Sequence, residues 1–309
     1  MDDIRNWVEN SPYSRFLGIK LDHIDETSAR LVLPYQDENS NPGKALHGGC
    51  AASLGAIAGQ AIARAALGPE SGPWHTAQMQ VSYLAAAIGE EVIAESHLLR
   101  RGRELCFVGI DVKTSEGKPI ASITTTVRGR MGGASHETYV SAGDAGEADP
   151  GIMGPHIGQV PFIGNRGIAV EHMTGGTSRL VMPFAENNSD ITGGVHEGAV
   201  LALLDTAGAM ASWAESGPGR YKASTASMQL QNLGPAPKGD LVAYGRCVEN
   251  DNEIYWSDVE VASASDGRVT ARGCVLYRSS MQESSEPNHQ IQKGERPHAH
   301  QPRCRRPQG

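Results

Sequence analysis

A single carboxylate interrupts a long apolar segment in the second half of the chain. Asp205 lies within residues 199–214, which otherwise consist mainly of apolar or small residues. Burying a carboxylate among such side chains costs free energy, so the residue needs hydrogen-bonding partners or a chemical task. Burial would also raise its pKa, which suits a general base. We therefore predict a catalytic role for Asp205, and a structural hydrogen-bonding role is the alternative.

A loop with several polar and glycine residues precedes the corresponding apolar segment of the first half. It contains Asn41, His47, Gly48 and Gly49, directly before residues 50–67. The first N–H groups of a helix have no partner within the helix and lie at the positive end of its dipole. Because glycine has no side chain, the Gly48 amide could approach a substrate carbonyl oxygen and stabilise the negative charge that forms on attack. Asn41 could donate a second N–H, and His47 either orients the loop or takes part in the chemistry.

Both segments belong to a sequence that repeats itself. Residues 31–35 resemble residues 180–184, which gives an offset of 180 − 31 = 149, and the same offset relates His47 to His196 and Thr76 to Thr225. A repeat of this length indicates two copies of one domain rather than a solenoid. We expect domain 1 at residues 1–130, a linker at 131–157, domain 2 at 158–280 and a disordered tail at 281–309.

Each copy has the same predicted order of elements. One alanine-rich segment, apolar on nearly all sides, predicts a buried helix at 50–67 in the first copy and at 199–214 in the second. Alternating segments separated by Gly, Asp and Asn turns then predict antiparallel strands. These are 76–84, 91–99, 104–114 and 119–128 in copy one, and 224–233, 240–248, 253–262 and 268–278 in copy two. The pattern favours an α+β fold in which a sheet wraps around a long helix.

Two features of the sequence resemble the PaaI-like acyl-CoA thioesterase branch of the hotdog superfamily. One is the stretch Asn41-Pro42-Gly43-Lys44-Ala45-Leu46-His47-Gly48-Gly49, and the other is a carboxylate nine residues after the second copy's histidine (205 − 196 = 9). The resemblance implies two tandem hotdog domains that hydrolyse an acyl-CoA thioester to a free acid and coenzyme A. It implies no metal or redox cofactor, since coenzyme A is part of the substrate. It places the site at the seam between two domains, one supplying the His-Gly loop and the other the acid. A hydroxyl near Thr76 or Thr225 would hold the attacking water, although strand propensity alone also accounts for these threonines.

The two copies differ at the positions that this arrangement needs. Where the second copy has Asp205, the first has Ala56, which cannot act as a base. The second copy has Asp190 and Glu197 where the first has an asparagine and a glycine. An ionised aspartate only accepts hydrogen bonds, and a glutamate adds negative charge beside a developing oxyanion. We therefore predict one inactive site and one intact composite site, formed by Asn41, His47, Gly48, Asp205 and Thr225.

The turn after the second long strand also differs between the copies, in the sign of its charge. The turn after the second long strand contains Arg100, Arg101 and Arg103 in copy one, whereas residues 249–253 of copy two are acidic or amide residues. Coenzyme A carries several phosphate charges, with which arginine pairs well. The basic turn is therefore a candidate docking site for coenzyme A, and a solvated charged turn is the alternative.

Other residues with reactive or aromatic side chains have ordinary structural interpretations. Cys50 has no base placed near it by the sequence, and we expect it to pack as a small core residue. Trp74, Trp213 and Met210 either line an acyl pocket or belong to the core.

Composition excludes several classes of protein. The net charge of −8 argues against a nucleic-acid binder that acts through overall charge. No uninterrupted apolar run predicts a membrane span, and the acidic N-terminus lacks a signal sequence. Five cysteines without a CxxC pair fit a reducing cytoplasm and offer no cysteine-rich metal site.

The predicted protein is thus a cytoplasmic acyl-CoA thioesterase that pairs as a homodimer of double hotdogs. A non-catalytic acyl-CoA-binding or regulatory hotdog protein is the alternative from another class. A hotdog hydratase acting on enoyl-CoA is a further alternative, but the loop pattern of such enzymes is not found here.

Overall fold

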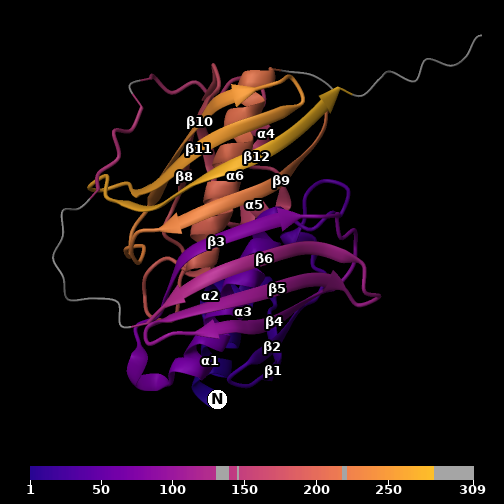
Figure 1. Cartoon of the computed structure of the whole chain (residues 1–309). Helices are drawn as coiled ribbons and strands as arrows, with labels where there is room; N and C mark the ends of the chain where they lie inside the picture. Colours follow the sequence, from indigo (N-terminus) through magenta and orange to yellow (C-terminus); the bar gives the residue numbers. More distant parts are fainter. Residues whose placement is uncertain (130–138, 145, 218–220, 282–309) are drawn as a thin grey trace, which may run out of the picture.

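Two similar halves follow one another along the chain in the computed structural model, which describes residues 1–129, 139–144, 146–217 and 221–281 (Figure 1). The predicted tail therefore lies almost wholly outside the described residues, as does part of the predicted linker. Described residues of that linker contact domain 2, since the Tyr139 hydroxyl donates to Glu260 at 2.5 Å and Arg179 pairs with Asp144.

The first half begins with two short helices, α1 (Asp2–Asn10) and α2 (Pro12–Leu17). A hairpin of β1 (Lys20–Ile24) and β2 (Ser28–Leu33) follows, and then the long helix α3 (Gly48–Leu67). Four strands complete the half: β3 (His75–Tyr83), β4 (Val92–Arg101), β5 (Leu105–Thr114) and β6 (Pro119–Arg128).

The second half repeats this order. It contains α4 (Gly154–Ile157), α5 (Pro161–Asn165), the hairpin β7 (Ala169–Thr174) and β8 (Thr177–Met182), and the long helix α6 (Glu197–Ser216). The strands β9 (Tyr221–Asn232), β10 (Leu241–Asn250), β11 (Ile254–Ser263) and β12 (Val269–Met281) follow.

The strands of the described residues form one twelve-stranded sheet in the order β1-β2-β4-β5-β6-β3-β9-β12-β11-β10-β8-β7. This order is symmetric about the β3–β9 pair, which is antiparallel and joins the two halves, with Gln78 opposite Gln231 and Ser82 opposite Ser227. The long helices α3 and α6 lie against one face of this sheet (Figure 1). Because β3 and β9 run in opposite directions, each end of the seam combines the start of one strand with the end of the other.

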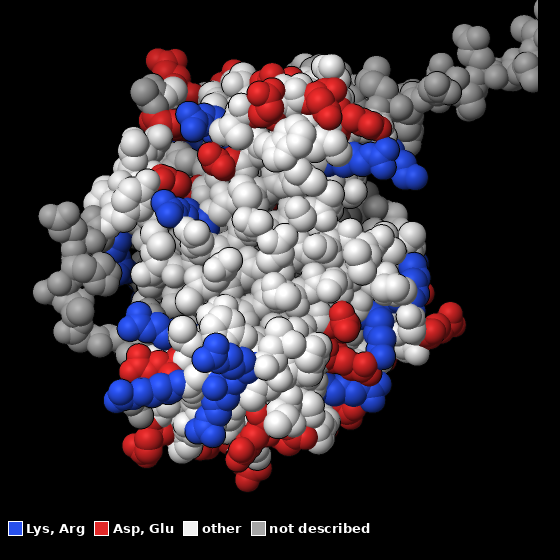
Figure 2. All heavy atoms as spheres, viewed as in Figure 1, with Lys and Arg blue, Asp and Glu red and all other residues white. Residues whose placement is uncertain are grey.

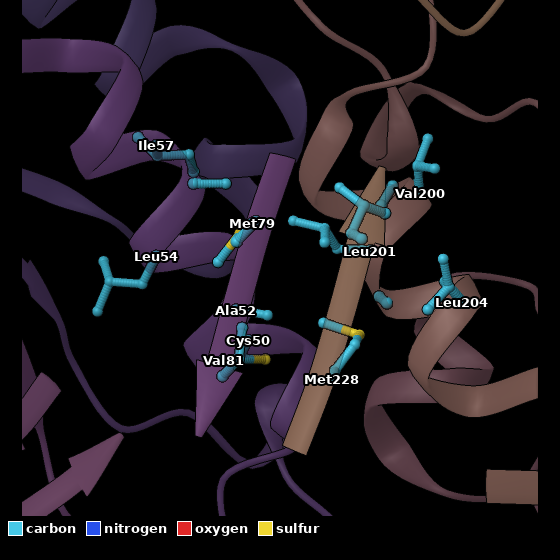
Figure 3. Packing of buried hydrophobic residues seen from close by; sticks show 14 of the residues in the cluster. Cys50, Ala52, Leu54, Ile57, Met79, Val81, Val200, Leu201, Leu204 and Met228 are labelled. Atoms are coloured by element: carbon cyan, nitrogen blue, oxygen red, sulfur yellow. The ribbon is translucent and has the colours of Figure 1, made fainter. Parts of the chain in front are cut away.

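The core lies between the helices and the sheet and is continuous across the seam. Met79 and Val81 of β3 lie beside Met228 of β9, in one buried cluster with Leu54 of α3 and Leu201 of α6 (Figure 3). Burial of such apolar surface is the main stabilising contribution to the joined fold.

The two long helices cross closely near their N-termini. A β-carbon at Gly49 would lie 2.9 Å from the β-carbon of Ala202, and one at Gly198 would lie 2.8 Å from the Ser53 hydroxyl. The helices can approach this closely because residues 49 and 198 have no side chains. The start of each helix therefore lies against the second turn of the other.

The first long helix has the composition of a membrane span but the burial of a core helix. Gly48–Leu67 has a mean hydropathy of 1.3 over an 18-residue window, of which 83% is buried inside the fold. The helix is thus covered by the sheet and by α6.

The outward face of the sheet has few charges at its middle. In Figure 2 the Lys, Arg, Asp and Glu side chains gather toward the two ends of the molecule, and the surface between them is largely uncharged. This surface lies over β6, β3, β9 and β12, whose outward residues include Gln78, Thr124, Gln229 and Gln231.

Candidate active site

The loop before α3 is fixed by His47, which caps the helix. Its Nδ1 accepts a hydrogen bond from the Gly49 N–H at 2.9 Å, and its ring stacks on Phe162 with centroids 4.3 Å apart. Burial lowers the pKa of His47 to about 4, so the ring is neutral near pH 7. Two roles of His47 were considered from the sequence, and these contacts support the one in which it orients the loop. Asn41 lies earlier in the same loop, where its backbone N–H donates to the Ala45 carbonyl at 2.7 Å, which leaves its side-chain amide as the candidate second donor.

The carboxylate of Asp205 lies directly beside Gly48, although the two residues come from different copies. A β-carbon at position 48 would lie 2.9 Å from Oδ2 of Asp205. The other carboxylate oxygen, Oδ1, accepts a hydrogen bond from the Thr225 hydroxyl at 2.8 Å. The structure therefore brings the first turn of α3, the middle of α6 and the start of β9 to one point on the seam.

The environment of Asp205 raises the pKa of its carboxyl group. The residue is only 4% exposed, and burial raises the pKa to about 6, while the hydrogen bond from Thr225 acts in the opposite direction. Asp205 is therefore mostly ionised at pH 7 and can still accept a proton, as a general base must.

The backbone N–H of Gly48 is available beside this carboxylate. The N–H of Gly49 is used by His47, and the Gly48 N–H has no acceptor in the part of the chain that the structure describes. It lies at the positive end of the α3 dipole. A carbonyl oxygen that accepts from it would place its carbon close to Asp205.

Two tyrosines that the sequence did not single out also belong to this site. The Tyr83 hydroxyl donates to the Gly48 carbonyl at 3.1 Å and would lie 3.4 Å from a β-carbon at position 48. Burial and the negative charge of Asp205 raise the pKa of Tyr83. Tyr277 is the cross-strand partner of Thr225, and its hydroxyl accepts a hydrogen bond from Trp213 at 2.8 Å. Nothing in the sequence distinguishes these strand tyrosines from core residues, except that each lies near the end of a predicted strand.

The basic turn of copy one is not brought to this site. Arg101 is paired with Cys106, Cys106 with Val127, and Val127 with Thr76, so the turn lies at the Thr76 end of β3. The site lies at the Tyr83 end of the same strand, and seven residues of a strand span about 24 Å. The expectation that Arg100, Arg101 and Arg103 serve the Gly48–Asp205 site therefore needs correction.

The acidic turn of copy two instead occupies the end of the sheet that carries the site. Ile254, directly after this turn, is paired with Arg278, and Arg278 is paired with Ser224, the residue before Thr225. The charges of both turns can be read from the sequence. The end of the sheet at which each turn lies depends on strand register across the seam.

The second copy of the site is filled by a side chain of the protein. Glu197, which corresponds to Gly48, accepts hydrogen bonds from the Gln60 amide at 2.6 Å and from the Thr76 N–H at 3.3 Å. It also pairs with His75, whose Nδ1 lies 2.9 Å from Oε1. Ala56 supplies no carboxylate there. The two ends of the seam are thus different, as the sequence differences indicated.

Comparison with known proteins follows the same division into two halves. Residues 36–128 match the family described as "Acyl-CoA thioesterase N-terminal domain", and residues 192–270 match "Thioesterase superfamily". A curated protein of Halobacterium salinarum that bears the provisional name of an esterase is 32% identical over 131 residues, which are 41% of this chain and 86% of that protein. The chain belongs to the thioesterase superfamily.

Several solved structures have the same tandem fold. A hot dog fold protein from Alicyclobacillus acidocaldarius has a TM-score of 0.60 and 15% identity, covering 89% of this chain and 98% of its own. A structure titled as a thioesterase from Novosphingobium aromaticivorans has a TM-score of 0.61 and 16% identity, covering 85% and 98%. One titled acyl-CoA thioesterase II from Mycobacterium marinum has a TM-score of 0.58 and 10% identity, covering 87% and 97%. The expected α+β architecture of two tandem hotdog domains is confirmed.

Proposed function

We propose that this thioesterase-superfamily protein hydrolyses acyl-CoA thioesters at one composite site per chain. The observation that carries the proposal is the 2.9 Å separation between Oδ2 of Asp205 and the position of a β-carbon on Gly48. It joins an unpartnered helix N–H from copy one with a carboxylate of raised pKa from copy two. This pairing supplies both an oxyanion donor and a base for acyl transfer.

In the proposed reaction the thioester carbonyl oxygen accepts a hydrogen bond from the Gly48 N–H, with Asn41 in the adjoining loop as a second donor. Asp205 removes a proton from a water molecule, which attacks the carbonyl carbon. The Thr225 hydroxyl holds Oδ1, so that Oδ2 is directed toward Gly48. When the C–S bond breaks, the protonated Asp205 returns its proton to the thiolate of coenzyme A. The products are the free acid and coenzyme A.

The phosphates of coenzyme A need cations at the end of the sheet that carries the site. Lys44 in the loop before α3 and Lys222 at the start of β9 are exposed there. In the proposal these two lysines bind the phosphates in place of the arginine turn, because they lie at the same end of the sheet as Asp205. Lysine binds phosphate as a point charge.

The proposal is tested with Asp205→Asn, which keeps the size of the side chain and removes the base. We expect turnover of acyl-CoA esters of short, medium, long and aromatic acyl groups to be lost, while binding of coenzyme A is retained. Asp111→Asn, an exposed strand aspartate, is the matched control. Full turnover by the Asp205 variant would overturn the catalytic assignment. Binding by the wild-type protein without turnover of any acyl-CoA would instead favour a regulatory acyl-CoA-binding protein.

A further inference from the structure

The carboxylate of Glu197 is surrounded by hydrogen-bond donors from the other half of the chain. Gln60 donates from α3, the Thr76 N–H donates from β3, and His75 pairs with it from the same strand. The side chain of Glu197 is 18% exposed and that of His75 only 4%. An amide, a backbone N–H and an imidazole converging on one carboxylate form the kind of donor set that binds a small anion.

The protonation state of His75 follows from its two partners. Its Nδ1 lies 2.9 Å from Oε1 of Glu197, and its Nε2 lies 3.2 Å from the Asn232 carbonyl oxygen. A carboxylate and a carbonyl oxygen only accept hydrogen bonds, so these two partners favour the doubly protonated ring of His75. Burial and the charge of Arg128 act to lower the pKa of His75, but the bonds to Glu197 and Asn232 outweigh them and raise it.

The same end of the seam is closed by further side chains. The Gln60 carbonyl oxygen accepts a hydrogen bond from Arg64 at 3.2 Å. The Arg64 guanidinium lies between two indole rings, 3.8 Å from the ring centroid of Trp7 and 4.7 Å from that of Trp74. Trp7 belongs to α1, so the N-terminal helix helps to cover this end of the seam.

We propose that this second copy of the site is a receptor for small carboxylates, occupied by the chain's own Glu197. The donors Gln60, Thr76 and His75 hold the Glu197 carboxylate at the position that corresponds to Gly48, which has no side chain. One end of the seam therefore has a glycine, and the other has a carboxylate of the chain itself in a set of donors. This inference does not depend on the proposed hydrolysis, since it concerns binding at the opposite end of β3.

The test is to remove the tethered carboxylate and to supply a free one. Glu197→Ala leaves His75 and Gln60 without their partner, so we expect Tm to fall by about 5–15 °C. Acetate or formate should then raise Tm of this variant saturably, because a ligand that binds only the folded state stabilises it. Sodium chloride at equal ionic strength and acetamide should not, and neither the wild-type protein nor Glu38→Ala, which removes an exposed glutamate, should respond to acetate.

Two results would overturn the inference: a Glu197→Ala protein as stable as Glu38→Ala, or a folded Glu197→Ala protein with no saturable response to acetate or formate. If the alanine variant does not fold, histidine NMR of the full chain decides. The wild-type His75 ring should carry both protons at pH 6.5, and its pKa should fall in Glu197→Gln, where the carboxylate is replaced by an amide. A wild-type His75 that is neutral at pH 6.5 refutes the receptor.

Discussion

The raised pKa of Asp205 follows from its burial, which outweighs the opposite effect of the hydrogen bond from the Thr225 hydroxyl. The sequence predicted both the residue and its raised pKa, because a carboxylate inside an apolar helix has few ways to be solvated. Gly48 followed from its place at a helix start and from the family resemblance. Tyr83 and Tyr277 could not be predicted, since their roles depend on contacts across strands and between the two halves.

The raised pKa of Asp205 predicts the pH dependence of the reaction. Only the ionised carboxylate can take a proton from water, so kcat/KM should rise with pH and be half-maximal near pH 6. The measurement is kcat/KM for one acyl-CoA from pH 4.5 to pH 8. In Asp205→Asn the residual rate should lack this inflection. An unchanged inflection in that variant would assign it to another group.

The same pKa makes a prediction about stability. The folded-state pKa of Asp205, about 6, lies above the usual value of 3.8 for an aspartate, so its contribution to stability is fully present below pH 3.8 and is lost as pH rises through about 6. A shift of about two pKa units corresponds to ~3 kcal/mol at pH 7. Asp205→Asn should therefore raise the free energy of unfolding at pH 7, and much less at pH 4. Denaturant titrations at both pH values check this, and a destabilised variant at pH 7 would argue for a structural role.

Tyr83 acts on the Gly48 peptide through one hydrogen bond. Tyr83→Phe removes the hydroxyl and keeps the ring, and the loss of about 1 kcal/mol of positioning corresponds to about a fivefold lower kcat. We expect KM to change little, because the ring remains in place. Steady-state kinetics of this variant and of Tyr35→Phe, a loop tyrosine, provide the comparison. A loss confined to KM would mean that Tyr83 contacts the substrate instead.

At the scale of elements, sequence periodicity predicted the two long helices and the eight long strands. Helix α3 starts two residues before its predicted start at 50, at Gly48, because the His47 side chain caps it there. The hairpins β1–β2 and β7–β8 were not predicted, since these strands of five and six residues offer too little alternation. The arginine turn lies at the end of β3 opposite Asp205, which charge patterns could not indicate because they carry no information about strand register.

The two long helices differ in the size of the residues that face the seam. Position 209 of α6 corresponds to position 60 of α3 (209 − 149 = 60), so Ala209, four residues after Asp205, corresponds to Gln60, which donates to Glu197. Ala209→Gln should therefore reduce turnover strongly by filling the space beside Asp205. Kinetics of this variant beside Ala65→Gln, a half-buried alanine of α3, make the test. Equal activity of the two variants would show that substrate does not use this space.

At the scale of the whole molecule, two hotdog domains share one sheet, and the seam between β3 and β9 has two unlike ends. One end combines an open glycine with a buried aspartate, and the other is occupied by Glu197 with His75. The repeat and the complementary differences between the copies indicated this division from the sequence. Joining both sheets into one could not be predicted, because it depends on which strands form the edge.

The central claim is that only the end with Gly48 is catalytic, and it is tested most directly by kcat of Gly48→Glu and Glu197→Gly, measured per folded molecule. Gly48→Glu places a carboxylate against Asp205 and blocks the oxyanion donor, whose loss costs about 10²–10³ in kcat. Glu197→Gly should lower stability, while kcat stays within about threefold of wild type. A threefold change corresponds to about 0.6 kcal/mol in activation free energy, and we expect a substitution at the distant end to change it by no more than this. Equal loss of kcat in both variants, or a larger loss in Glu197→Gly, would contradict the account.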